Sequence, residues 1–143
     1  RHIFNNLTYY IIIYMNKILV EVSVGELLDK ISILEIKKEK IKDKDKLSYI
    51  IDELNVLKNQ LNKNVKSDKT LDALFISLKE INSKLWVIED DKRLCEKNSD
   101  FGENFIKLSR DIHFLNDKRA NIKLEMNNHT GSKIKEIKQY TNY

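Results

Sequence analysis

The sequence predicts an all-α fold, a helical bundle built on a long antiparallel helical hairpin with a short extended N-terminal segment. Apolar residues from Phe101 to Met126 recur at alternating steps of four and three, with Arg119 as the polar residue in the series. A matching series runs from Leu71 to Cys95, and both have the period of an amphipathic helix. The chain of 143 residues contains no proline and only three glycines, so few positions interrupt a helix. Two long helices joined by a short turn, with facing coiled-coil-like seams, form the predicted hairpin.

The first part of the chain predicts an extended segment followed by two helices. Residues 17–24 alternate β-branched with other side chains, a pattern typical of a short strand or an extended segment. Ser23 and Glu26 form an S-x-x-E capping box that starts the first helix. We expect that helix to end at residues 42–45, because lysines in its last turn complement the helix dipole. The second helix is expected over about residues 46–65, where apolar residues approach a heptad repeat.

The two long helices have capping signals at their starts. Ser67 or Asp68 is expected to cap the third helix, which continues to about Lys97. Asp100 with Glu103 repeats the capping pattern and is expected to open the fourth helix. The turn of the hairpin therefore falls between the end of the third helix near Lys97 and the cap at Asp100.

The two ends of the chain differ from its helical middle. The fourth helix should stop at residues 127–131, a turn cluster whose glycine is the expected positive-φ residue. The tail after it, residues 132–143, is polar and fits either a short helix or an extended strap. Residues 1–14 precede an ordinary-looking start at Met15, and we interpret them as a non-domain extension. A single helical domain is expected over residues 15–143.

Composition and charge narrow the function classes. The net charge of +4 is modest, and carboxylates interrupt every basic stretch, so nucleic-acid binding is not favoured. The single cysteine, Cys95, excludes an internal disulfide and fits a reducing, cytoplasmic compartment. The aromatic run at residues 9–14 is too short to span a bilayer, so no membrane partner is expected.

Motifs of familiar chemistry do not occur in the sequence. It contains no phosphate loop, no dinucleotide-binding glycine pattern, no C-x-x-C and no H-E-x-x-H. The three histidines lie far apart along the chain, so neither a metal site nor a cofactor is expected. Cys95 falls on the apolar face of the third expected helix and is interpreted as a small hydrophobe. The sequence therefore identifies no catalytic residue.

One polar cluster lies on the two helices of the expected hairpin. A turn near residue 99 would place Glu89 near Arg110 and Trp86 near His113. The cluster comprises Trp86, Glu89, Asp90, Arg93, Arg110, His113, Asn116, Asp117 and Arg119. Ion pairs on solvated helix faces are the structural interpretation of this cluster. A cleft that holds an anionic ligand on an arginine fork is the functional interpretation.

Three function classes remain open at this point. The leading hypothesis is a non-enzymatic adaptor or assembly protein, which binds a protein partner or a second copy of itself through its helical faces. The alternative is a small-molecule or nucleotide-processing enzyme that uses the carboxylate and arginine cluster. Two-metal chemistry would further require acids such as Glu26, Asp29, Glu89 and Asp90 to converge. Nucleic-acid binding is the weakest of the three.

Several short stretches together resemble a known family. They are Ser23 to Ile31, Ile33 to Lys37, Leu85-Trp86, Ile88 to Asp91 with Arg93, Phe101, Phe105-Ile106, Arg110, Asn116-Asp117, Arg119-Ala120, Gly131-Ser132 and Lys138 to Tyr140. From about Ile18 to Tyr140 the chain resembles the DUF6165 family of small uncharacterised bacterial and phage proteins. The family often has a proline after the serine of its opening motif, where this chain has Val24. The resemblance implies no activity and at most a link to surface-polysaccharide biosynthesis, and it supports placing residues 1–14 outside the domain.

Overall fold

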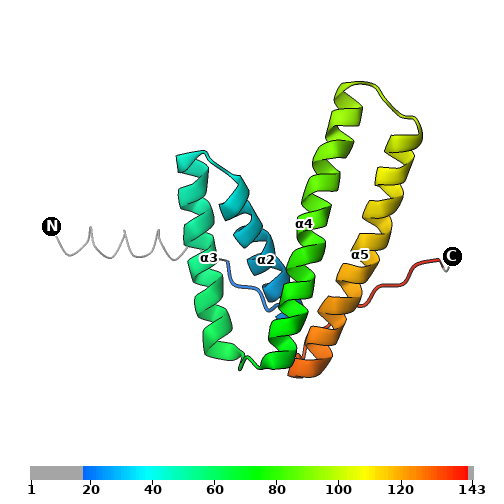
Figure 1. Cartoon of the computed structure of the whole chain (residues 1–143). Coiled ribbons are helices and arrows are strands. Elements are labelled where there is room, and N and C mark those ends of the chain that lie inside the picture. Colours follow the sequence, from blue (N-terminus) through cyan, green and yellow to red (C-terminus); the bar gives the residue numbers. More distant parts are fainter. Residues whose placement is uncertain (1–17, 142–143) are drawn as a thin grey trace.

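The computed structural model describes residues 18–141 of the chain, and within that range the regular structure is entirely helical (Figure 1). The helices are α2 (Val24–Lys40), α3 (Lys44–Asn64), α4 (Lys69–Lys97) and α5 (Glu103–Thr130). The predicted all-α helical bundle is therefore confirmed. The proposed extension at residues 1–14 lies outside the described residues.

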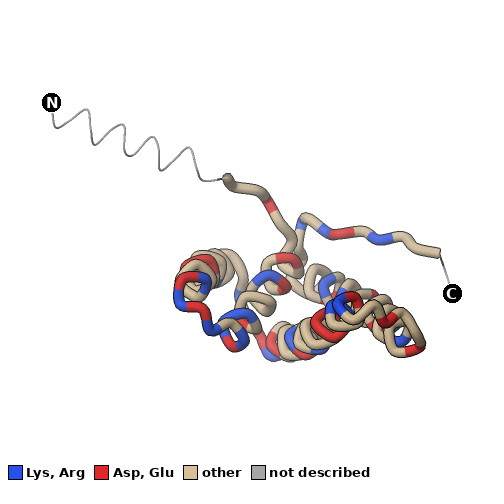
Figure 2. The backbone as a smooth tube through the Cα atoms, turned by 90° about the horizontal axis from the view of Figure 1, so that it is seen from above, with Lys and Arg blue, Asp and Glu red and all other residues tan. Residues whose placement is uncertain are grey.

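Helix α2 lies at the centre of the bundle, in contact with α3, α4 and α5. The longer helices α4 and α5 lie side by side, and the end that carries their connecting turn extends past α2 and α3 (Figure 1). Lys and Arg residues are interleaved with Asp and Glu along the helices (Figure 2). Within residues 18–141, none of the helices combines the length and the apolar composition needed to cross a membrane.

Local capping signals set most of the helix boundaries. The Ser23 side chain accepts a hydrogen bond from the backbone N–H of Glu26 at 3.1 Å, as the capping box predicts. Of the two candidates for the next long helix, Asp68 is the cap, and its carboxylate accepts from the N–H of Leu71 at 2.9 Å. Gly131 follows α5 with φ of 66°, the left-handed conformation expected at that position.

Residues 18–23 belong to neither a helix nor a strand, which agrees with an extended segment, one of the two forms that the sequence allowed. Two boundary predictions are wrong in detail. Asp100 does not cap α5; its carboxylate accepts from the N–H of Gly102 at 3.2 Å in the preceding turn. Gly102 is the residue before the helix and has no side chain to act as a cap. Helix α3 begins two residues earlier than expected because Asp43 caps it.

The core lies on either side of α2. One cluster of buried residues joins α2 to α4 and α5, and the other joins α2 to α3. The first comprises Leu28, Leu71, Leu78 and Met126, and the second comprises Ile31, Leu34, Ile50 and Leu54. Phe75 and Leu61 pack against both clusters and so connect them.

The apolar seams of α4 and α5 supply their buried faces. Leu85 and Leu108 are buried, as the seams predict. Phe101 is the exception, because it lies in the turn that extends past α2 and α3 and is 52% exposed. Its ring contacts Phe105 edge to face at 5.4 Å. Cys95, at the same end of the α4 seam, is buried, so the exposure is local to Phe101.

The tail after α5 is an extended strap, one of the two forms that the sequence allowed. Residues 132–141 contain no helix and lead away from the bundle (Figure 2). Ser132 ties the start of the strap to the start of α2, because its hydroxyl accepts from the N–H of Val24 at 3.2 Å. The two ends of the helical region thus lie together.

Candidate functional site

A polar groove lies where the second half of α2 meets α4 and α5. Its volume is about 460 Å³. The lining residues are Ile33 and Ile36 of α2, Asn82, Leu85, Trp86, Glu89, Asp90 and Arg93 of α4, and Asn116 and Arg119 of α5. We call this surface the polar groove. Six of the nine candidates from the sequence line it, namely Trp86, Glu89, Asp90, Arg93, Asn116 and Arg119.

The other three candidates do not line the groove. The guanidinium of Arg110 lies over the ring of Phe114, at 5.7 Å from its centroid. His113 contacts the same ring edge to face at 5.5 Å, and Asp117 is also absent from the groove lining. Arg110 and Arg119 are about two and a half helical turns apart, so they face opposite sides of α5.

The expected pairing of Glu89 with Arg110 is not found. Glu89 instead accepts a hydrogen bond from Arg93 of its own helix, with Nη1 3.2 Å from Oε2. This is an exposed pair one helical turn apart, a common arrangement on helix surfaces. This ion pair within α4 neutralises two of the charges in the groove without a contribution from α5.

The floor of the groove is an ion pair between α2 and α5. Arg119 donates to both oxygens of the Asp29 carboxylate, from Nε at 3.0 Å and from Nη2 at 2.6 Å. Asn82 of α4 donates to the same carboxylate at 2.8 Å and to the Ser32 hydroxyl at 2.7 Å. Asp29 is 2% exposed, so its charge is compensated entirely by protein groups. Three helices are joined at this point.

Lys123 forms a second ionic contact one turn further along α5. Its ammonium lies 2.6 Å from Glu26, 3.1 Å from Glu136 and 3.6 Å from Asp29. Burial alone would lower the pKa of Lys123, but the hydrogen bonds of Glu26 and Glu136 and the charge of Asp29 outweigh burial and raise that pKa. Glu136 belongs to the strap, so this contact also fixes the tail.

A close backbone approach holds the start of α2 against α5. The N–H of Gly25 donates to the side-chain oxygen of Asn127 at 2.7 Å. A Cβ atom added at Gly25 would lie 2.5 Å from the carbonyl oxygen of Lys123. Only glycine fits this contact without movement of the backbone, which explains the glycine in the opening motif.

The sequence reasoning did not identify the partners of Arg119. The sequence allows Asp29 and Glu26 as metal ligands, but in the structure the two carboxylates bind Arg119 and Lys123. Within residues 18–141, no group of three or more His, Cys, Asp or Glu side chains has the geometry to hold a metal ion. The available signal was Arg119 itself, since a charged residue within an apolar seam requires a buried partner.

Several groups in the polar groove remain available to a ligand. The side chains of Asp90 and Asn116 make no hydrogen bond or ion pair with any other residue in the described range 18–141. Arg119 uses Nε and Nη2 for Asp29, which leaves the Nη1 donors. The groove can therefore donate and accept hydrogen bonds beside the Trp86 indole.

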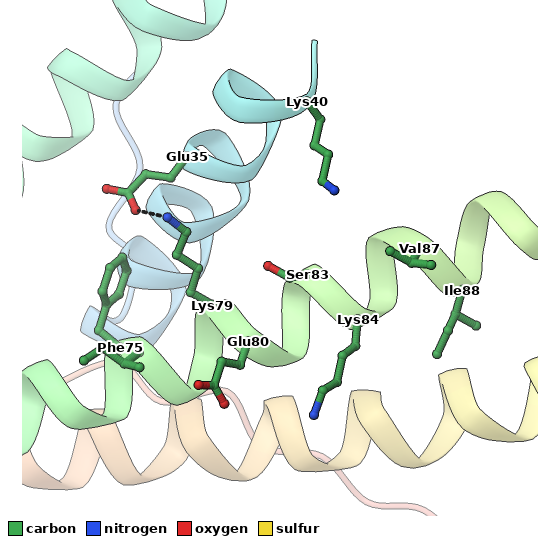
Figure 3. A pocket seen from close by; sticks show the side chains of 10 residues that line it. Glu35, Lys40, Phe75, Lys79, Glu80, Ser83, Lys84, Val87 and Ile88 are labelled. Carbon is green, nitrogen blue, oxygen red and sulfur yellow. Dashed lines mark hydrogen bonds and ion pairs between the residues drawn. The ribbon is translucent and has the colours of Figure 1, made fainter.

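A second groove lies on the other side of α4, between that helix and α2. It has a volume of about 890 Å³. It is lined by Glu35, Lys40, Phe75, Ile76, Lys79, Glu80, Ser83, Lys84, Val87 and Ile88. In Figure 3 the Ser83 side chain and the Lys40 ammonium point into the space between the two helices. We call this surface the apolar groove.

Comparison with known proteins identifies one family. The sequence model of the family of unknown function DUF6165 matches residues 18–143, in agreement with the resemblance noted in the sequence. Neither the curated proteins nor the solved structures contain a significant match.

Proposed function

The chain belongs to the DUF6165 family, and because that family has no known function, we propose from the geometry of α4 that the protein is a non-enzymatic helical adaptor. In this proposal the apolar groove receives an amphipathic helix of a partner protein. The observation that carries it is an apolar surface on α4 that no helix of the described chain covers. Ile76 and Val87 line the groove and are 60% and 50% exposed.

The dimensions of the groove suit a helical segment. Its α4 wall runs from Phe75 to Ile88, which corresponds to about 20 Å of helix. A partner helix of about four turns can lie along such a wall and place three or four apolar side chains on it. The volume of about 890 Å³ also exceeds what one or two side chains occupy.

The charged residues that line the apolar groove indicate which kind of partner helix would bind there. Lys79 is bound by Glu35 and Glu39, with distances of 3.0 and 2.9 Å. Lys40 and Lys84 make no ion pair within residues 18–141, and the same is true of one lining acid, Glu80. The unpaired cations outnumber the unpaired acid, so the favoured partner helix carries acidic residues beside its apolar stripe.

The other hypotheses from the sequence receive less support. The carboxylates of Glu26 and Asp29, on which two-metal chemistry would depend, are bound by Lys123 and Arg119. Charges of both signs are interleaved along the helices (Figure 2), which does not favour nucleic-acid binding. We further propose a cytoplasmic location, which suits the single, buried thiol of Cys95.

A titration with designed peptides tests the adaptor proposal. The probe is a 15N-labelled full chain, and the ligand is a helical peptide of about four turns with a leucine stripe flanked by glutamates. We expect shifts of the amide signals of residues 75–88, and much weaker shifts with a lysine-flanked version of the peptide. The variant Lys84→Glu should weaken binding of the glutamate-flanked peptide, because it reverses one of the complementary charges.

A control variant and two contrary results complete the test of the adaptor proposal. Lys63→Glu makes the same charge change on α3, away from the groove lining, and should leave binding unchanged. If neither peptide shifts these signals, or if both bind with the same affinity, the groove does not select an acidic amphipathic helix.

A further inference from the structure

We propose that the polar groove binds a neutral polyhydroxylated ring, the chemical class of a monosaccharide unit. This inference goes beyond the adaptor function, since it concerns the other side of α4 and a small-molecule ligand. The juxtaposition that carries it is Trp86 beside unpaired hydrogen-bonding groups from α4 and α5.

The unpaired groups match a ligand that both donates and accepts hydrogen bonds. Asp90 offers only acceptors, the Nη1 atom of Arg119 offers only donors, and the amide of Asn116 offers both. A hydroxyl group can satisfy all three. An ammonium ion only donates and an ionised phosphate mainly accepts, so each would match only some of these groups.

The charge of the groove also favours a neutral ligand. Its two arginines are each bound to a carboxylate, Arg93 to Glu89 at 3.2 Å and Arg119 to Asp29 at 2.6 Å. The remaining ionic group without a partner in residues 18–141 is Asp90, which would repel a phosphate. Arg110, the arginine fork that the sequence suggested for an anion, lies over Phe114 and does not line the groove.

The apolar part of the lining complements the carbon face of a sugar ring. Trp86 is partly buried and lies in the lining with Leu85, Ile33 and Ile36. An aromatic side chain of this kind presents a flat apolar face together with a polar N–H. The groove volume of about 460 Å³ falls within the range of small-molecule sites, about 300–1,000 Å³.

The groove is also held in shape before any ligand binds. Arg119 is fixed by two hydrogen bonds to Asp29, and Asn82 ties the same carboxylate to α4. A floor that is braced by three helices reduces the ordering that binding would otherwise require.

Trp86 provides a direct assay, because it is the single tryptophan of the chain. The full chain is titrated with the methyl glycosides of glucose, galactose, mannose and N-acetylglucosamine while tryptophan fluorescence is recorded. Saturation-transfer difference NMR on the same glycosides detects binding that leaves the fluorescence unchanged. We expect saturable binding of at least one glycoside and none of inorganic phosphate or putrescine.

Matched variants place the binding in the groove. Asn116→Ala should weaken glycoside binding by about tenfold, the effect of one lost hydrogen bond of about 1.4 kcal/mol. Asp90→Asn should weaken it by a smaller factor, because an amide oxygen accepts a weaker hydrogen bond than a carboxylate does. The controls Asp91→Asn and Asn121→Ala change exposed residues of the same helices that do not line the groove, and should bind as the unmodified chain does.

Three results would overturn the proposal. The first is that none of the glycosides binds by either method. The second is that phosphate or putrescine binds in their place, which would assign the groove to a charged ligand. The third is binding that Asp90→Asn and Asn116→Ala leave unchanged, which would place the sugar elsewhere on the protein.

Discussion

Replacing Arg119 with methionine should destabilise the protein by about 3 kcal/mol, because the change leaves the Asp29 carboxylate buried without its two-point partner. Removing one partner of a buried ion pair costs about 3–5 kcal/mol, since the other charge then lacks compensation. The Asp29 side chain is 3% exposed, so water cannot replace the guanidinium. Asn82 at 2.8 Å and Lys123 at 3.6 Å remain near the carboxylate, which places the expected cost at the lower end.

A second substitution separates the lost charge from the lost packing. Asp29→Asn in the Arg119→Met background removes the uncompensated charge and keeps an oxygen that can accept from Asn82. We expect it to recover about 2 kcal/mol of the loss, because residues of one buried network are coupled. Arg93→Met is the control, since it breaks an exposed pair on the groove rim and should change stability by less than about 0.5 kcal/mol.

Urea unfolding followed by helical circular dichroism measures these differences. With the slopes typical of small domains, a loss of 3 kcal/mol lowers the urea midpoint by about 1–3 M. A midpoint for Arg119→Met within the range of the Arg93→Met control would contradict the reasoning. Strictly additive effects of the Asp29 and Arg119 substitutions would show that the two side chains do not interact in solution.

Three further predictions concern the core, the helix contact and the pH dependence of stability. Leu108→Ala should destabilise by about 2–5 kcal/mol in urea unfolding, because it removes a buried seam residue, whereas Leu94→Ala at an exposed position should change little. Gly25→Ala should cost about 1–3 kcal/mol in thermal or urea unfolding, because the new methyl group overlaps the Lys123 carbonyl. Burial would raise the pKa of Glu35, but hydrogen bonds from two lysines lower it overall. The contribution of Glu35 to folding stability is therefore present above its unfolded pKa of about 4.3 and is lost as pH falls through the lowered folded pKa. The urea midpoint of Glu35→Gln should therefore fall less between pH 7 and pH 3 than that of the unmodified chain. An equal fall in the two proteins would count against the ion pairs of Glu35.

Local features of the fold were predictable from the sequence because their causes lie within a few residues. The Ser23 cap, the Asp68 cap and the left-handed Gly131 each depend on one turn of backbone. The seams predicted which faces of α4 and α5 are buried. The failure at Asp100 has the same local character, since its side chain satisfies the turn instead of the helix.

The candidate site was only partly predictable because it depends on how helices far apart in sequence are placed. Helical spacing grouped the residues of α4 well, but it did not distinguish Arg119, which faces the groove, from Arg110, which lies over Phe114. The sequence suggested Asp29 of α2 as a metal ligand and did not predict its ion pair with α5. Asp29 is 90 positions from its partner Arg119, and no local pattern relates them.

The claim that the apolar groove receives a partner helix is tested most directly by photo-crosslinking in the natural host. A photoreactive benzoylphenylalanine replaces Ile76 in the groove or, as a control of similar exposure on α3, Val56; these residues are 60% and 55% exposed. The proposed function predicts that Ile76 captures a helical segment with acidic residues beside an apolar stripe, identified by mass spectrometry, and that Val56 does not. Capture of a second copy of this chain, of a non-helical segment, or of nothing beyond the Val56 control would contradict it.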